Sequence, residues 1–526
     1  MRRMKGAAGL LTALLLAFQL SAQTFALANE DNGIKVVPVN FTHNGYSYEI
    51  EGVAKSTDGD YQIKSPARLA ARKLPSTYDP RSSGEITTVK DQASTGACWA
   101  FSALACAEQD LIKKGLENPS TEFSVPALVL SSNSGTATGK DDFSSGGNWL
   151  FAASALANGQ GLCYEDYEPF LESGTENMIV SENKKSVSEY RLNYVMELSS
   201  TTQVKRKIME LGAVSASYFA GNGYMNHNNT AYYDPDASKN TIINHSVTVV
   251  GWDDNYSKDN FRYKPANNGA WLVKGSWGAD QDNDGFYWVS YDEAEFGQFC
   301  CYDFEESCDN TYHYSKMTGY VVNASNDGSV YGANVFTAKA DEKLDKAGFM
   351  YVGKTGSADY TLSVYTNVSD SDPIGVLETQ ISGSVSANGF YTVDFPEDIL
   401  IEEGEKYSIS VKFSGDSGRG YLLAESDRTS KAQSGQSYVS LNGKYWSDVG
   451  ADKTDSIGSL FIYAYTDDTA KPDKSSLESA LVKYGTLAGC EREANNARTV
   501  LADETASKND ISNAQKLLIS AAEEQD

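Results

Sequence analysis

A cysteine preceded by two small residues, at the start of a predicted helix, constrains this chain more than any other feature. Cys98 opens a stretch rich in Ala and Leu that ends in a basic turn and a glycine, which predicts a helix over residues 98–114. A helix N-terminus stabilises a thiolate, because unpaired backbone N–H groups and the macrodipole face the sulfur. Gln92, six residues upstream, is placed to donate a side-chain N–H to an oxyanion beside the Cys98 backbone N–H. The alternative is a buried structural cysteine in a core helix.

A thiolate nucleophile needs a base, and the chain has four histidines: His43, His227, His245 and His313. His245 precedes four consecutive β-branched residues closed by a glycine, a pattern that predicts a buried strand. A histidine at the start of such a strand is held rigidly while its ring edge stays accessible. His227 lies in a polar loop with nothing obvious to fix an imidazole. His245, 147 residues after Cys98, is therefore the preferred base.

The residues around Cys98 resemble the papain family of cysteine peptidases. Residues 95–99 match the local signature of that family at every position except the first, where the family has a disulfide cysteine. The resemblance covers residues 74–296, through the further segments Leu74-Pro75, Gly146-Gly147-Asn148-Trp149, Tyr167-Glu168-Pro169-Phe170, residues 211–215 and residues 271–278. It implies an α+β fold, a papain-like peptidase of two subdomains over residues 74–300. It also implies the site residues: catalytic Cys98, His245 and Gln92, and substrate-binding Gly146, Gly147, Asn244 and Trp277.

One position departs from the family pattern. The family usually has an asparagine where this chain has Gly275, and the oxygen of that asparagine accepts a hydrogen bond from the imidazole and fixes its tautomer. Gly275 has no side chain to do this, although the shielding Trp277 is retained. Water or a backbone carbonyl are alternative orienters. If none is present, Gly275→Asn is expected to raise turnover.

The sequence after about Tyr302 predicts a different kind of domain. Short alternating runs at 360–365, 407–411 and 460–465, separated by turn residues such as those at 386–389, predict an antiparallel β-sandwich. Residues 310–467 resemble the lectin-like domain that follows papain-type peptidases in secreted proteins of Gram-positive bacteria. Residues 469–526 show helical periodicity and resemble FIVAR-type helical modules of bacterial surface proteins.

The first 28 residues have a basic start, an apolar run and a small-residue cleavage site, and so predict a secretory signal peptide. Residues 29–73 form an N-terminal extension or a short pro-region. No other segment is apolar enough to span a membrane. We therefore expect a protein that is secreted, or attached non-covalently to the surface of a Gram-positive bacterium.

The charge balance excludes some classes of partner. With 44 basic and 71 acidic residues the formal charge is −27, which argues against nucleic acids and anionic membranes, since both favour basic patches. The seven cysteines show no disulfide framework or zinc-ligand spacing, although Cys300 or Cys301 could close a small loop with Cys308. Residues 280–285 resemble the start of an EF-hand, but Tyr291 stands where a glutamate is needed, so neither a metal nor a cofactor is expected.

Two functions are compatible with these observations. The first is a secreted endopeptidase that forms an acyl-enzyme on Cys98 and acts on proteins or peptides, with glycans as further ligands of the lectin-like region. The second is a weak or inactive peptidase homologue that acts as a surface adhesin or glycan-binding protein, as Gly275 and the lectin-like region suggest.

Overall fold

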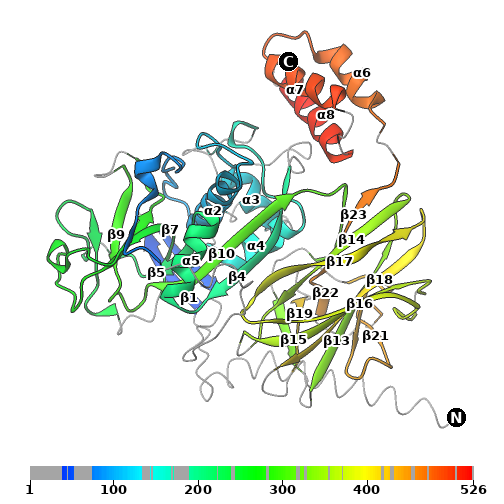
Figure 1. Cartoon of the computed structure of the whole chain (residues 1–526), viewed down its shortest axis with the longest axis horizontal. Helices are drawn as coiled ribbons and strands as arrows, with labels where there is room; N and C mark the ends of the chain where they lie inside the picture. The colour runs from blue at the N-terminus through cyan, green and yellow to red at the C-terminus, as the bar shows by residue number, and fades with distance from the viewer. Residues whose placement is uncertain are drawn as a thin grey trace. The chain divides into compact units, whose positions relative to one another are not determined.

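The computed structural model describes residues 38–43, 46–51 and 74–523, apart from residues 133–142, 144–145, 168–169, 171–188, 222, 238–242, 280–283, 316–319, 325–327, 354–355, 370, 416–419, 427–431, 452–456, 471–472, 504–505 and 507. The chain divides into two compact units, one whose described residues fall between 38 and 305 and one whose described residues fall between 306 and 523 (Figure 1). The predicted signal peptide lies outside the described residues. Of the 29–73 extension the structure describes an antiparallel hairpin of β1 (Pro38–His43) and β2 (Tyr46–Glu51).

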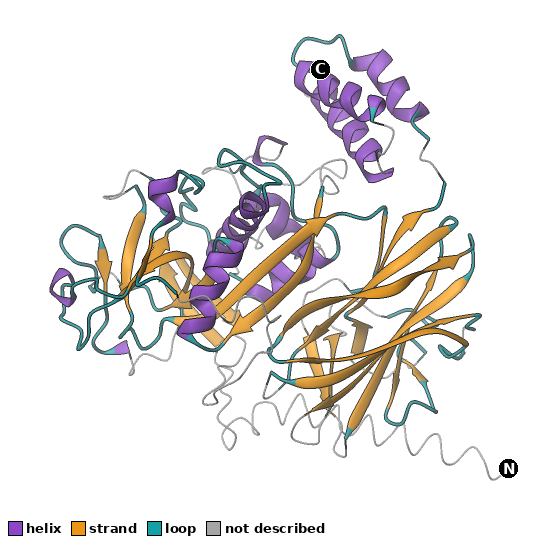
Figure 2. Ribbon diagram, viewed as in Figure 1, coloured by secondary structure: helices purple, strands orange, loops and turns teal. Residues whose placement is uncertain are grey.

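The unit that contains Cys98 combines helices with one sheet, as the α+β prediction requires (Figure 2). The strands follow the order β4-β10-β5-β7-β8-β9-β6, and β3 pairs with β7. The pairs β5–β7, β7–β8 and β8–β9 are antiparallel, whereas β6–β9 is parallel. The strands are β3 (Thr77–Tyr78), β4 (Tyr190–Leu198), β5 (Val214–Tyr218), β6 (Ala231–Tyr232), β7 (His245–Asp253), β8 (Ala270–Lys274), β9 (Phe286–Ser290) and β10 (Gly297–Glu306). The α-helices are α2 (Cys98–Lys114), α3 (Val125–Ser132), α4 (Trp149–Ala157) and α5 (Thr201–Leu211), with 3-10 turns at Pro80–Ser83, Glu165–Tyr167 and Lys258–Asn260.

Helix α2 begins and ends where the sequence predicts. It closes at Gly115, whose φ of 73° is left-handed and whose N–H donates to the carbonyl of Ile112. Its inner turns are buried. The Ser102 hydroxyl donates to the Val247 carbonyl over 2.7 Å, which ties the first turns of α2 to β7. This contact joins the two elements that carry Cys98 and His245.

Residues 310–468 form the antiparallel sandwich that the alternating pattern predicts. Its sheets have the orders β11-β23-β14-β17, β12-β19-β22 and β16-β15-β18-β13-β20-β21. Leu362, Ile409 and Phe349 belong to the shared core. The strands are β11 (Asn310–Tyr312), β12 (Tyr320–Ala324), β13 (Ser329–Thr337), β14 (Glu342–Tyr351), β15 (Ala358–Thr366), β16 (Val376–Val385), β17 (Gly389–Ile401), β18 (Lys406–Gly415), β19 (Tyr421–Ser426), β20 (Ser437–Ser440), β21 (Ser447–Asp448), β22 (Ile457–Leu460) and β23 (Ile462–Asp468).

One strand prediction in this region is wrong in detail. Residues 460–465 were expected as one strand, but the chain breaks at Phe461 between β22 and β23. The Phe461 N–H pairs with Leu423 and its carbonyl with Met350, so this residue passes from one sheet to the other. A hydrophobic run shows no such change of sheet, because every residue in it remains buried.

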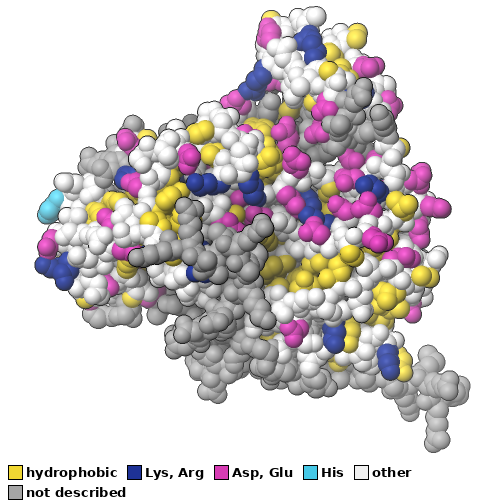
Figure 3. All heavy atoms as spheres, in the orientation of Figure 1, with side chains coloured by type: hydrophobic (Ala, Val, Ile, Leu, Met, Phe, Trp, Pro, Cys, Tyr) yellow, Lys and Arg dark blue, Asp and Glu magenta, His cyan; other side chains and the backbone are white. Residues whose placement is uncertain are grey.

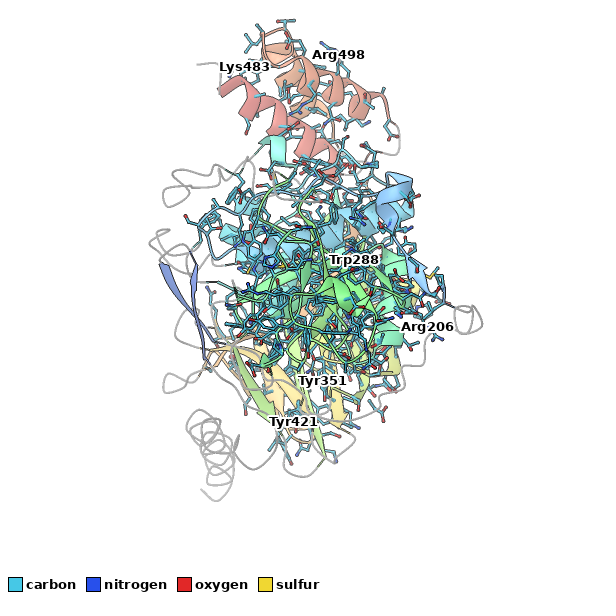
Figure 4. All side chains as sticks on the ribbon, turned by 90° about the vertical axis from the view of Figure 1, so that its left-hand side faces the viewer. Arg206, Trp288, Tyr351, Tyr421, Lys483 and Arg498 are labelled. Atoms are coloured by element: carbon cyan, nitrogen blue, oxygen red, sulfur yellow. The ribbon has the colours of Figure 1, made fainter. Side chains whose placement is uncertain are left out.

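The C-terminal residues form three helices, α6 (Ser475–Tyr484), α7 (Glu491–Ala502) and α8 (Lys508–Glu523). Leu477, Ala494, Ile511 and Leu518 share a core, as the helical periodicity predicts. The resemblance to FIVAR-type modules stays a prediction. Figure 4 labels residues from each part: Arg206 and Trp288, then Tyr351 and Tyr421, then Lys483 and Arg498.

No helix among the described residues is long and apolar enough to cross a membrane. The same residues contain no group of three or more His, Cys, Asp or Glu side chains that could hold a metal ion, and residues 280–283 of the EF-hand-like segment lie outside them. The seven cysteines lie among the described residues and none of them forms a disulfide, so the loop closure considered for Cys308 is not formed. On the face in Figure 3, acidic side chains are more widespread than basic ones, in keeping with the net charge.

Candidate active site

Cys98 is the first residue of α2, and the helix N-terminus faces its sulfur. The backbone N–H groups of Trp99 and Ser246 and the Ser246 hydroxyl lie near the thiol group and favour its charged form. The side chain is nonetheless buried, with 3% of its surface exposed. Burial raises the pKa of the Cys98 thiol, because the hydration that a thiolate loses outweighs the effect of these nearby donors. Burial thus opposes the stabilisation that the helix N-terminus gives, and a neighbouring base is needed to remove the proton.

His245 is the first residue of β7, as predicted, and lies between two aromatic side chains. Its ring stacks on Trp277, with centroids 4.2 Å apart and planes 6° apart. Tyr218 approaches it edge-on at 5.9 Å. Ser246 follows His245 directly in β7 and lies near the Cys98 sulfur, so the backbone of β7 at His245 passes close to the nucleophile. His227 is exposed on its loop, which favours His245 as the base.

Gln92 is buried, and its amide is fixed from both ends. Its Oε1 accepts from the Ser276 hydroxyl over 2.5 Å, and its Nε2 donates to the Thr95 carbonyl over 2.9 Å. The Gln92 backbone N–H donates to the Ser276 carbonyl over 2.8 Å. An amide Nε2 carries two hydrogens, so one remains for an oxyanion beside Cys98. Ser276 thus sets which end of the Gln92 amide can donate.

The four residues predicted to bind substrate differ in their surroundings. Gly147 packs against Trp99, and a Cβ at this position would lie 2.4 Å from the indole, so only glycine fits. Gly146, with φ of 68°, and Gly147 are both buried, and their role in substrate binding stays a prediction. Asn244 accepts from the Ala220 N–H over 2.6 Å and donates to its carbonyl, which anchors the loop before β7. Trp277 stacks on His245 as described.

Sequence reasoning missed three residues: Ser246, Ser276 and Tyr218. Both serines are next to predicted site residues in the sequence. Serine is so common in loops and strands that its presence there is not a specific signal of function. Tyr218 is recognisable only once the β5–β7 register is known, because that register places it opposite His245.

A buried ionic cluster lies behind the nucleophile. Glu108 of α2 accepts from the Thr87 hydroxyl over 2.6 Å, and its other oxygen lies 3.6 Å from the Lys90 ammonium. Lys274, the last residue of β8, lies 3.7 Å from Glu108 and donates to Thr87. Burial lowers the pKa of Lys274. The cluster ties α2 to the strand that ends at Gly275 and so helps to fix the distance between the two halves of the site.

Two family models match the chain: "Papain family cysteine protease" over residues 74–326 and "Lectin like domain" over residues 311–466. Among curated proteins, cathepsin K of Mus musculus is 24% identical over 216 residues, which are 41% of this chain and 59% of that protein. Procathepsin L of Rattus norvegicus is 28% identical over 234 residues, 42% of this chain and 61% of that protein. The chain thus spans about three fifths of the length of these relatives.

Two solved structures resemble more of the chain. The clostridial cysteine protease Cwp84 after propeptide cleavage is 28% identical, with a TM-score of 0.65, over 75% of this chain and 99% of that chain. The cysteine protease and lectin-like domains of Cwp84, described as a surface layer associated protein of Clostridium difficile, share the fold at 24% identity, with a TM-score of 0.66 over 86% of this chain and 97% of that chain. Residues 74–326 therefore match the papain family of cysteine proteases, and residues 311–466 match a lectin-like domain that follows it.

Proposed function

We propose that the protein hydrolyses peptide bonds through an acyl-enzyme on Cys98. The observation that carries the proposal is the arrangement around the nucleophile: Ser246 lies near the sulfur, His245 precedes Ser246 in β7, and Trp277 stacks on the imidazole. The family membership of residues 74–326 supports the same chemistry.

The proposed reaction begins with proton removal, because burial favours the neutral thiol. His245 takes the proton as Sγ attacks the carbonyl carbon, and Gln92 with the Cys98 N–H receives the oxyanion. His245 then gives the proton to the leaving amine, and a thioester to Cys98 forms. Water then attacks this thioester, and His245 accepts a proton from the water. As the carbon–sulfur bond breaks, His245 gives this proton to the sulfur, which restores the thiol and releases the carboxylic acid.

We infer that this activity takes place outside a Gram-positive cell. The basic and apolar pattern of residues 1–28 supports secretion, and the likeness to Cwp84, a surface layer associated protein, supports a role at the cell surface. The proposed substrates are proteins or peptides. The lectin-like domain is the part of the chain proposed to bind glycans. Fractionation of cells that express the whole chain tests the location, because recovery mainly from the cytosol would contradict it.

Activity on an unfolded protein tests the chemistry. The wild type is expected to cleave reduced, denatured casein, whereas Cys98→Ala and His245→Ala are not. Cys106→Ala is a matched control, since Cys106 is a buried thiol on the same helix, outside the site, and its loss should leave cleavage unchanged. An inactive wild type would reject the proposal.

The second candidate, an inactive homologue that acts as an adhesin, is favoured by Gly275 and the lectin-like domain. It predicts binding of a surface glycan by a wild type that cleaves nothing. Cleavage that depends on Cys98 would reject the adhesin-only account, whether or not glycans bind.

A further inference from the structure

The place that an orienting side chain at position 275 would enter is already filled. A Cβ built on Gly275 would lie 3.1 Å from the Gly285 carbonyl oxygen and 3.3 Å from Cε1 of Tyr287. The Gly275 N–H donates to the same Gly285 carbonyl over 3.1 Å, so this oxygen has little freedom to move. The Tyr287 ring therefore lies in tight contact with the place where the missing side chain would begin.

Tyr287 is joined to the strand partner of His245. Its hydroxyl lies 2.8 Å from the hydroxyl of Tyr218, within hydrogen-bond distance. Tyr218 and Tyr287 expose only 1% and 4% of their surfaces. Burial raises the pKa of both hydroxyl groups, so both keep their protons at any pH at which the enzyme would work, and the bond between them persists.

Tyr218 contacts His245 directly. The antiparallel register of β5 and β7 places the two residues opposite each other, the arrangement in which side chains on one face of a sheet lie closest. Their rings meet edge-on at 5.9 Å. Tyr232 and Phe296 pack against Tyr218 at 5.0 and 5.5 Å, so its ring is fixed by other contacts as well.

We propose that Tyr218, held by Tyr287, is the positioning residue of His245 and replaces the side chain that Gly275 lacks. Trp277 covers one face of the imidazole, and Tyr218 limits its movement from the opposite strand. Ring contacts with Trp277 and Tyr218 thus contribute to the orientation that a side-chain hydrogen bond supplies in other papain-like sites. This inference rests on the proposed peptidase function and adds two residues to its machinery.

Two measurements test this inference. One is the hydrolysis of denatured casein, resolved into kcat and KM. The other is the alkylation of Cys98 by iodoacetamide, followed by mass spectrometry at pH 6 and pH 10. At pH 6 the buried thiol reacts only if His245 takes its proton, whereas at pH 10 it ionises increasingly without help. A positioning effect should therefore lower kcat and the pH 6 rate together and leave KM and the pH 10 rate unchanged.

The variants are Tyr287→Phe, Tyr218→Phe and both together. Each single change is expected to lower kcat and the pH 6 alkylation rate about threefold to tenfold, the effect of one hydrogen bond, with KM within about twofold of the wild type. The double variant should lose no more than either single variant, because the two hydroxyl groups act as one pair. It also leaves no unpaired hydroxyl group, so it provides a folded protein if a single variant is unstable.

Tyr302→Phe is the matched control. Tyr302 is a buried tyrosine of β10, outside the described site, and the loss of its hydroxyl should leave both measurements unchanged. Wild-type kcat and pH 6 rates in the double variant would overturn the inference, and so would an equal loss in Tyr302→Phe. A wild type that neither cleaves casein nor reacts at pH 6 would instead reject the proposed function, so the two failures are distinguishable.

Discussion

The imidazole of His245 and the indole of Trp277 lie parallel, with centroids 4.2 Å apart and planes 6° apart. The face of an indole attracts a cation, by about 0.5–2 kcal/mol according to how far water is excluded. His245 is 5% exposed, so little water competes with this contact. The stack therefore favours the imidazolium that forms when Cys98 loses its proton, and it offsets part of the burial that opposes the thiolate.

Gln92→Ala is expected to lower kcat about 100-fold to 1,000-fold, the usual effect of removing one oxyanion donor, with a small change in KM. Ser276→Ala should lower kcat by a smaller factor, because it frees the Gln92 amide to rotate without removing it. Steady-state kinetics on one peptide substrate measures both. Equal decreases in kcat in the two variants would contradict the oxyanion assignment. An unchanged kcat in Gln92→Ala would contradict it too.

Gly275→Asn is expected to destabilise the protein and to leave turnover at or below the wild-type value. The sequence predicts a gain only if no other group orients His245, and in the structure the new Cβ would press on the Gly285 carbonyl and the Tyr287 ring. Overpacking of this kind costs about 1–3 kcal/mol. Thermal unfolding and kcat measure the two effects.

Removal of the Tyr287 ring supplies the control for this prediction. In a Tyr287→Val background only the contact with the Gly285 carbonyl remains, so adding Gly275→Asn should cost less stability there than in the wild type, as measured by thermal unfolding. Higher turnover in the single Gly275→Asn variant would show that the site is not crowded.

The sequence predicted those features that depend on local pattern. The bounds of α2 follow from its Ala and Leu content and Gly115, and the start of β7 follows from the β-branched run after His245. The crowding beside Gly275 was not predictable, because it depends on residues 285 and 287 returning beside β8. The burial of Cys98 and the partnership of Tyr218 with His245 likewise arise from packing and strand register, which no single segment encodes.

Asp110 is expected to make the stability of the fold depend on pH. It is buried in α2 and accepts from the Phe304 N–H over 2.7 Å and from the Lys114 ammonium over 2.8 Å. Burial, aided by the nearby Asp303 carboxylate, raises the pKa of Asp110 from 3.8 to about 7. Between these two values the folded protein keeps a proton that the unfolded chain has released, so its contribution to the free energy of unfolding falls as pH rises.

Asp110→Asn removes this titration. Relative to the wild type, the variant should therefore gain stability as pH rises from 4 to 8, measured as the difference between their melting temperatures at each pH. A difference that stays constant over this range would contradict the raised pKa.

The rate of Cys98 alkylation as a function of pH tests the pairing of Cys98 with His245 most directly, because it needs no substrate. Burial raises the pKa of the thiol, so a cysteine in this position without a base should react with iodoacetamide only at alkaline pH. We predict that wild-type Cys98 reacts at pH 5–7 faster than a free cysteine, and that His245→Ala loses this reactivity while His227→Ala keeps it. Wild-type reactivity no faster than that of a free cysteine at pH 5–7, or reactivity that survives in His245→Ala, would contradict the pairing.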